Sequence, residues 1–264
     1  PATGELWDRH FSGYGYWGLP ENETDNRIGG DEDRVAKGKT LNLWFVAAFA
    51  HLGQLLDNEE YVGRALAHWK LAYKPDSPDL AHAAQTIFAA RELDLATGDP
   101  TFEKIALEAA KKIVACQSHD DTIDGWYAGS PGGKPAYGVV DDGLPAAALG
   151  RWTEWYPEDA FVESARESLT RYIGYMQAIS NNPLCIAKVH TQKHDAWFFP
   201  FAKDGDWHVG QNSQYLSDAW AALVAHRVTG ENRALEVALD QINWVLGCNP
   251  YGICMMQGKG RVNS

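Results

Sequence analysis

Residues 213–246 read SQYLSDAWAALVAHRVTGENRALEVALDQINWVL, and this stretch decides the fold class. Apolar side chains recur three and four residues apart on both sides of a short polar turn, which is the spacing of one face of an α-helix. The turn is Thr229-Gly230-Glu231-Asn232. The stretch therefore predicts one helix from Ser213 to Val228 and a second that returns to Leu246.

Three segments upstream repeat this helix–turn–helix plan. Their apolar stripes run from Leu43 to Leu55 and Tyr61 to Trp69, from Asp79 to Ala96 and Phe102 to Val114, and from Leu144 to Trp155 with a return to Met176. In the Thr97-Gly98-Asp99-Pro100 turn, Gly98 suits the left-handed position after a helix, and Asp99 suits the cap of the next. Thr40 is the candidate cap of the first helix. Four hairpins predict an all-α fold of the α/α-toroid type, a six-hairpin-type barrel that is incomplete in this chain.

The first 34 residues carry no helical period. They are rich in turn-forming and charged residues, and we expect an irregular lead-in that holds at most a short strand pair. The whole of residues 1–264 is predicted to form a single domain of helical hairpins. Because the chain starts at Pro1 rather than Met, we expect it to be processed, trimmed or part of something longer.

Composition excludes several classes of partner. The formal net charge of −12 disfavours nucleic acid and anionic membranes, and no apolar run approaches the roughly 20 residues of a membrane span. No phosphate-binding or dinucleotide-binding loop is present, so we expect no cofactor. The cysteines Cys116, Cys185, Cys248 and Cys254 form no CxxC pair. Cys248 and Cys254 are interpreted as small buried apolar residues rather than zinc ligands or a disulfide.

Aromatic residues gather in two long loops, residues 117–143 and 180–212, which such a toroid would place at one rim. A sugar ring presents an apolar face and a fringe of hydroxyl groups, which flat rings and neighbouring polar side chains can bind. These aromatic side chains could instead fill the ends of the helical toroid as part of its core. The sequence favours an oligo- or polysaccharide partner, with these predicted substrate contacts: Trp126, Tyr127, His190, Trp197, Trp207, Asn212 and Tyr215.

Asp141 and Asp142 are the candidate catalytic carboxylates. Neighbouring carboxylates can push their pKa values apart and so supply an acid or a base. However, an Asp just before a helix is often a cap, and that alternative stays open. His190 and His194 are spaced for a metal site beside Asp195, but the segment lacks helical period and a third ligand, so we expect no metal.

The end of the chain resembles glycoside hydrolase family 9, the inverting endoglucanases and related β-glucanases. The similarity rests on a helix followed by LGxNPxGxS and a run to GxG, matched here at Leu246, Gly247, Asn249, Pro250, Gly252, Gly258 and Gly260. The segments Gln211–Tyr215 and Pro20–Arg27 resemble two further family segments more loosely. The resemblance implies a secreted or periplasmic polysaccharide hydrolase.

The same resemblance implies that the catalytic machinery has no matching positions here. The family's base lies in a DAGD-type motif and its acid lies beyond an HHR-type motif, and this sequence contains neither. Three functions remain open: an inverting glucan hydrolase whose carboxylates and completing helices come from a missing segment or an additional chain; a non-catalytic glycan-binding relative; or another α/α-toroid enzyme, an unsaturated glucuronyl hydrolase or polysaccharide lyase, that uses Asp141 or Asp142 with a histidine of the rim.

Overall fold

The structure is a computed structural model. It describes residues 7–11, 34–37, 42–119, 123–133, 142–190, 196–197, 211–256 and 258–260. The chain divides into two compact units, Pro1–Lys74 with Glu92–Gly98, and Pro75–Arg91 with Asp99–Ser264. The prediction of one domain over residues 1–264 stays a prediction.

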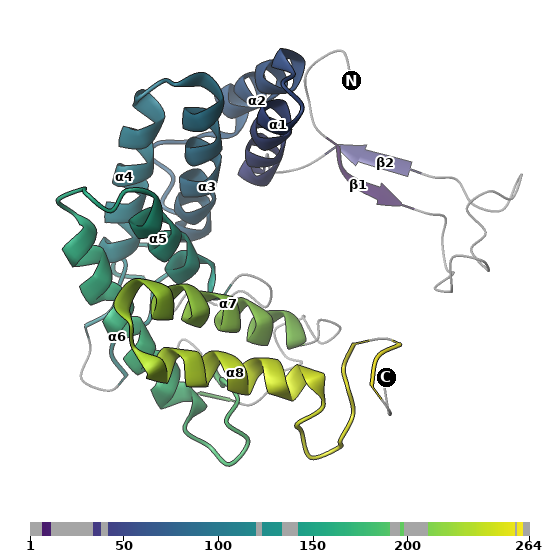
Figure 1. Cartoon of the computed structure of the whole chain (residues 1–264), viewed down its shortest axis with the longest axis vertical. Helices are drawn as coiled ribbons and strands as arrows, with labels where there is room; N and C mark the ends of the chain where they lie inside the picture. The colour runs from purple at the N-terminus through teal and green to yellow at the C-terminus, as the bar shows by residue number, and fades with distance from the viewer. Residues whose placement is uncertain are drawn as a thin grey trace, which may run out of the picture. The chain divides into compact units, whose positions relative to one another are not determined.

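The first unit joins a strand pair to a helical hairpin. Strands β1 (Trp7–Phe11) and β2 (Arg34–Lys37) pair antiparallel, with Trp7 opposite Lys37 (Figure 1). A strand pair was expected within residues 1–34, and the second strand begins only at the last of them. Helices α1 (Leu43–Leu55) and α2 (Glu59–Ala72) pack on each other. Asn42 caps α1, since its side chain accepts a hydrogen bond from Trp44 N at 2.8 Å. Thr40, the predicted cap, lies outside the described residues.

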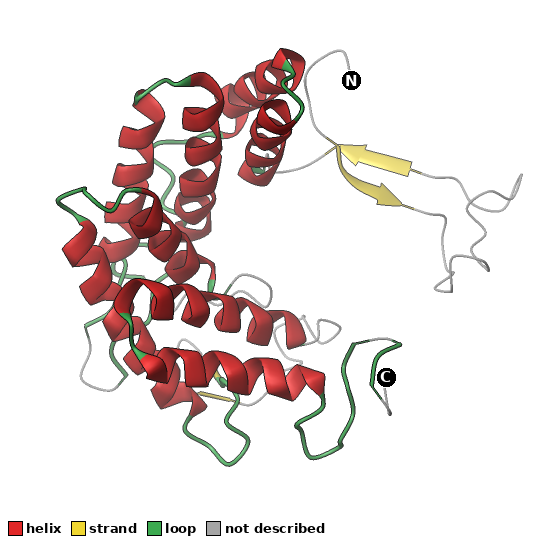
Figure 2. Ribbon diagram, viewed as in Figure 1, coloured by secondary structure: helices red, strands yellow, loops and turns green. Residues whose placement is uncertain are grey.

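In the described part of the second unit, the regular elements are helices apart from one short strand pair (Figure 2). Helix α3 (Leu80–Thr97) belongs to it as far as Arg91. The remaining elements are α4 (Thr101–Ala115), α5 (Leu144–Trp155), α6 (Val162–Ser180), the pair β3 (Val189–His190) and β4 (Ala196–Trp197), α7 (Asn212–Thr229) and α8 (Asn232–Leu246). The eight helices of the described chain follow the predicted hairpins, and this confirms the all-α class.

The two short turns have the predicted chemistry. Gly98 and Gly230 both adopt left-handed backbone, with φ of 68° and 76°. Asp99 Oδ1 accepts a hydrogen bond from Thr101 N at 2.9 Å and so caps the start of α4. A side chain with a Cβ would be strained at either glycine, which explains why the two hairpins share this turn.

Helices α5 and α7 lie side by side and run in the same direction. Near their N-terminal ends, Gly143 N donates to Ser217 Oγ at 3.0 Å, and a Cβ on Gly143 would collide with the backbone carbonyl of Ser217. Midway, a Cβ on Gly150 would meet the side chain of Val224. Two glycines therefore let the helices approach more closely than larger residues would allow.

The family-like end of the chain terminates α8. Gly247 has a φ of 114° and ends the helix in left-handed backbone. The Asn249 side chain then donates to Trp244 O at 2.9 Å and Ile253 O at 2.8 Å, and accepts from the backbone N–H groups of Tyr251 and Ile253. One amide thus satisfies four backbone groups, so this segment has a structural role.

None of the helices in the described part of the chain has both the length and the apolar character of a membrane span.

Candidate functional site

The candidate site is built around Asp142, which lies two residues before the start of α5. Its carboxylate Oδ2 accepts a hydrogen bond from Gln214 Nε2 of α7 at 3.1 Å. Asp142 is half-buried, whereas Gln214 is fully buried. Gly143, and not Asp142, occupies the N-cap position of α5, so no side chain caps this helix. Asp141, the other candidate carboxylate, lies outside the described residues.

Gln214 is itself held by a relay of buried polar groups on α7. Gln211 Nε2 donates to Gln214 Oε1 at 3.1 Å, and the Tyr215 hydroxyl donates to Gln211 Oε1 at 3.3 Å. The three hydrogen bonds run in one direction, from a hydroxyl donor through two amides to a carboxylate acceptor. Because buried amides are costly to leave unpaired, the relay fixes the Gln214 amide that binds Asp142.

A second carboxyl group, Asp218, lies behind Asp142. It sits one helical turn after Gln214 on α7 and is 1 % exposed. Burial, and then repulsion from the Asp142 carboxylate, raises the pKa of Asp218 well above the ordinary value of 3.8. The Gln214 amide and the Tyr172 hydroxyl lower that pKa but offset only part of the rise.

Tyrosines of α6 close the site from another side. Burial raises the pKa values of Tyr172 and Tyr175 well above their ordinary value, and the Asp142 and Asp218 carboxyls add to the rise. Tyr172 also stacks on Tyr127 with ring centroids 5.7 Å apart. The site is therefore a pair of carboxyl groups walled by neutral phenols. Such a site can hold a proton and accept hydrogen bonds from hydroxyl groups.

Three of the predicted substrate contacts are core residues. Trp126, Tyr127 and Tyr215 are 6 %, 5 % and 1 % exposed, so their rings have no face open to a sugar. The expectation that they bind substrate is thereby corrected. The physical reason for Trp126 and Tyr127 is that a bridge between Gln117 and Tyr127 pairs the chain with itself, and the Tyr127 hydroxyl bonds to Ser168 Oγ of α6 at 2.9 Å. Tyr215 is buried because it packs in a cluster with Ile186, Trp244 and Val245.

The other expected contacts are placed in part or not at all. Asn212 begins α7 and is half-buried, so it stays a predicted contact. The side chains of His190 and Trp197, and all of Trp207, His194 and Asp195, lie outside the described part. Within the described residues, no group of three or more potential metal ligands is found.

The cysteine prediction is half right. Cys254 is buried as expected, but Cys248 is exposed, because it follows the glycine that ends α8 and so leaves the helix face that packs on the core. All four cysteines are free.

Asp218 is the residue that the sequence did not reveal. Its nearest sequence signal is an acidic residue within the apolar run that follows Ser217, which an amphipathic interpretation assigns to a solvated face. Only the parallel packing of α5 and α7 brings Asp218 to Asp142. Gln214 and the tyrosines of α6 likewise reach the site only through contacts between helices.

The sequence of the chain matches the model of one known protein family. The family model described as "Glycosyl hydrolase family 9" matches residues 3–263. No match is found among curated protein sequences.

Solved structures share the fold. A family 9 protein of Bacteroides ovatus is 16 % identical with a TM-score of 0.57. The aligned region covers 100 % of this chain and 48 % of the Bacteroides chain. A metagenome-derived family 9 endoglucanase is 17 % identical with a TM-score of 0.61, and covers 98 % and 45 %. An unsaturated glucuronyl hydrolase specific for heparin is 11 % identical with a TM-score of 0.53, and covers 82 % and 58 %. These likenesses confirm the α/α-toroid type of fold. The chain spans about half the length of the two family 9 structures.

Proposed function

The chain belongs to glycosyl hydrolase family 9, and on this basis we propose that it contributes to hydrolysis of a β-linked glucan or a related polysaccharide with inversion. The observation that carries the proposal is the family match over residues 3–263, nearly the whole chain. An inverting glycosidase needs an acid and a base held apart by the space for one water molecule. We assign neither role within this chain. Both carboxylates, and the helices that complete the toroid, come from a further segment or an additional chain.

The substrate-binding part of the proposal rests on polar groups near the start of α7. Asn212 and Asp142 are half-buried, so each presents some polar surface to solvent. Neutral hydroxyl groups can donate to the carboxylate and pair with the amide without meeting the charge repulsion that a polyanion would. His190, Trp197 and Trp207 remain the proposed aromatic and imidazole contacts.

The need for completing helices is supported by exposed apolar side chains on α7. Leu216 is 46 % exposed and Trp220, one turn later, is 38 % exposed. Large apolar groups at this spacing on one helix face are what a neighbouring helix buries. About half of each matched family 9 structure has no counterpart in this chain, so the proposed cover is further helices of the same toroid.

A second candidate is favoured by the paired carboxyls. Asp142 and Asp218 lie together at the α5–α7 contact, and an unsaturated glucuronyl hydrolase is among the structures of similar fold. In this alternative, Asp142 would itself act on an unsaturated uronide. The chain's net charge of −12 disfavours such an anionic substrate, so the glucan hydrolase is preferred.

Two measurements test the proposal. Isothermal calorimetry should detect cellohexaose binding by this chain, and a reducing-sugar assay of the complete encoded protein should detect its cleavage. Asp142→Asn should weaken cellohexaose binding but leave the turnover of bound substrate largely intact, whereas loss of turnover would favour the glucuronyl hydrolase. Binding without turnover by the complete protein would instead make it a non-catalytic glycan binder. Absence of both binding and cleavage would overturn the assignment.

A further inference from the structure

We propose that Asp218 is a positioning residue that shares one proton with Asp142, so that Asp218 holds the proton and Asp142 remains the carboxylate. The inference concerns residues of this chain alone. It holds whether the polysaccharide is a neutral glucan or a uronate.

The first step is geometric. Gly143 lets the start of α5 lie against the backbone of α7, since its N–H reaches Ser217 Oγ at 3.0 Å and a Cβ there would strike the Ser217 carbonyl. Asp142 and Asp218 each directly neighbour one residue of this contact in sequence. The same close approach that joins the helices therefore brings Asp142 to the face of α7 that carries Gln214 and Asp218, where the two carboxyl groups interact.

The second step is that two adjacent carboxyl groups, one buried and one half-buried, do not both ionise. Asp218 is 1 % exposed, and a buried carboxylate is tolerated only where positive charge or several donors compensate it. Among the residues that the structure describes, the groups that interact with this pair are the phenols of Tyr172 and Tyr175 on α6 and of Tyr215 on α7, and burial raises the pKa of each, so they stay neutral. The guanidinium of Arg171 on α6 bonds to Gln117 instead.

The third step identifies which carboxyl group keeps the proton. The relay runs from the Tyr215 hydroxyl through Gln211 and Gln214 to Asp142 Oδ2, so Asp142 accepts. A protonated carboxyl group could also accept at its carbonyl oxygen, so the difference in burial decides the assignment. Asp218 is 1 % exposed, whereas Asp142 is half-buried and reaches solvent. Because desolvation disfavours the charged form, the buried Asp218 keeps the proton and Asp142 carries the charge.

The consequence is a defined dependence of stability on pH. Because the pKa of Asp218 is raised in the folded protein, the folded state holds a proton that the unfolded chain releases above about 3.8. The stabilisation is complete below that pH and is lost as pH rises toward the raised value. Within this window, the unfolding equilibrium constant gains up to about tenfold per pH unit from this one group.

Denaturant unfolding between pH 4 and pH 8 tests the inference on the parent chain and Asp218→Asn. The amide stands in for the neutral acid, so the ratio of the parent's unfolding constant to the variant's should grow by at least about tenfold from pH 4 to pH 8. The exposed Asp76→Asn is the matched control and should follow the parent at every pH. A parent-to-variant ratio that stays constant across the range would overturn proton sharing.

A second measurement covers the case in which Asp218→Asn does not fold. In protein labelled with ¹³C at the aspartate γ-carbon, one buried carboxyl should titrate far above its ordinary range. Asp142→Asn should lower that midpoint by removing the neighbouring negative charge. An unchanged midpoint, or no carboxyl that titrates late, would refute the pair. These readouts use no sugar, so failure to bind cellohexaose would affect only the proposed function.

Discussion

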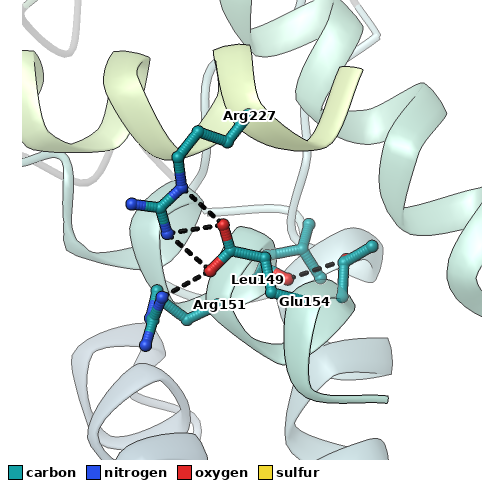
Figure 3. Close-up of polar contacts among 5 residues, drawn as sticks. Leu149, Arg151, Glu154 and Arg227 are labelled. Carbon is teal, nitrogen blue, oxygen red and sulfur yellow. Dashed lines mark hydrogen bonds and ion pairs between the residues drawn. The ribbon is translucent and has the colours of Figure 1, made fainter. Parts of the chain in front are cut away.

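The two ends of the contact between α5 and α7 differ in the charged side chains that they bring together. At the N-terminal end, two acidic side chains meet: the buried Asp218, which holds a proton, and the half-buried Asp142, which accepts a hydrogen bond from the Gln214 amide. At the C-terminal end, Glu154 of α5 binds Arg227 of α7 with 2.6 Å contacts to both carboxylate oxygens (Figure 3). Arg151 of α5 also donates to this carboxylate, at Oε2.

The difference indicates that the N-terminal end of the α5–α7 contact is more sensitive to substitution than the C-terminal end. The Glu154 side chain is 22 % exposed and that of Arg227 is 52 % exposed, so water screens their attraction. Nothing comparable screens the buried Asp218. An exposed pair of opposite charge contributes little and tolerates change, whereas a pair of carboxyl groups with one buried member is sensitive to each neighbour. We therefore expect the effects of substitution to decrease from the N-terminal to the C-terminal end.

The largest effect is expected from Gly143→Ala. The added methyl group would meet the Ser217 backbone carbonyl and Ala221 Cβ, and backbone cannot rotate away, so the helices must separate. We expect a loss of about 3 kcal/mol in the free energy of unfolding, measured with urea. Gly174→Ala on α6 is the control, because nothing lies within 4 Å of its Cβ. It should stabilise the helix by up to about 1 kcal/mol. Equal effects at both glycines would mean that close approach is not what Gly143 provides.

An intermediate effect is expected from Gln214→Leu. The change removes the amide that donates to the Asp142 carboxylate and breaks the relay to Gln211, at a cost of about 2 kcal/mol. Because the site is buried, 1 M NaCl should leave this loss nearly unchanged in a denaturation experiment. The half-buried Gln85→Leu on α3 serves as the control and should alter stability by less than about 0.5 kcal/mol. A loss that salt abolishes would contradict the assignment of this end as buried.

The smallest effect is expected from Glu154→Gln. Removing the charge weakens the bonds to Arg227 and Arg151, but both partners can turn to water, so the loss should be about 0.5 kcal/mol. High salt should reduce even that. Glu163→Gln, in an exposed pair with Arg166, provides the comparison and should change stability still less. A loss at Glu154 as large as that at Gln214 would remove the contrast between the two ends.

The sequence predicts the helices well and the site poorly, for a physical reason. The span Leu144–Trp155 and the turns at Gly98 and Gly230 depend on local capping and on periodic apolar residues, which neighbours in sequence determine. The Asp142–Asp218 pair depends on contact between residues from two different hairpins. No local pattern encodes such a contact, so Asp218 was missed.

The rings of Trp126 and Tyr127 illustrate the opposite error. Their Gly- and Asp-rich surroundings suggested an exposed rim, yet the chain there folds back on itself, with Ala128 N bonded to Cys116 O at 2.8 Å. A polar loop composition indicates turns, but it does not indicate which side of those turns faces solvent.

The Asn249 cap has a consequence for tracing descent within the family. The residues that most clearly mark the lineage are held in place by the needs of a helix end, where one amide serves four backbone groups and glycines take left-handed backbone. Selection can therefore preserve this signature in a descendant that has abandoned catalysis, because the helix must still stop there. A sequence search that relies on this signature would therefore find active and inactive members of the family together. A second signature, at the catalytic carboxylates, would be required to distinguish them.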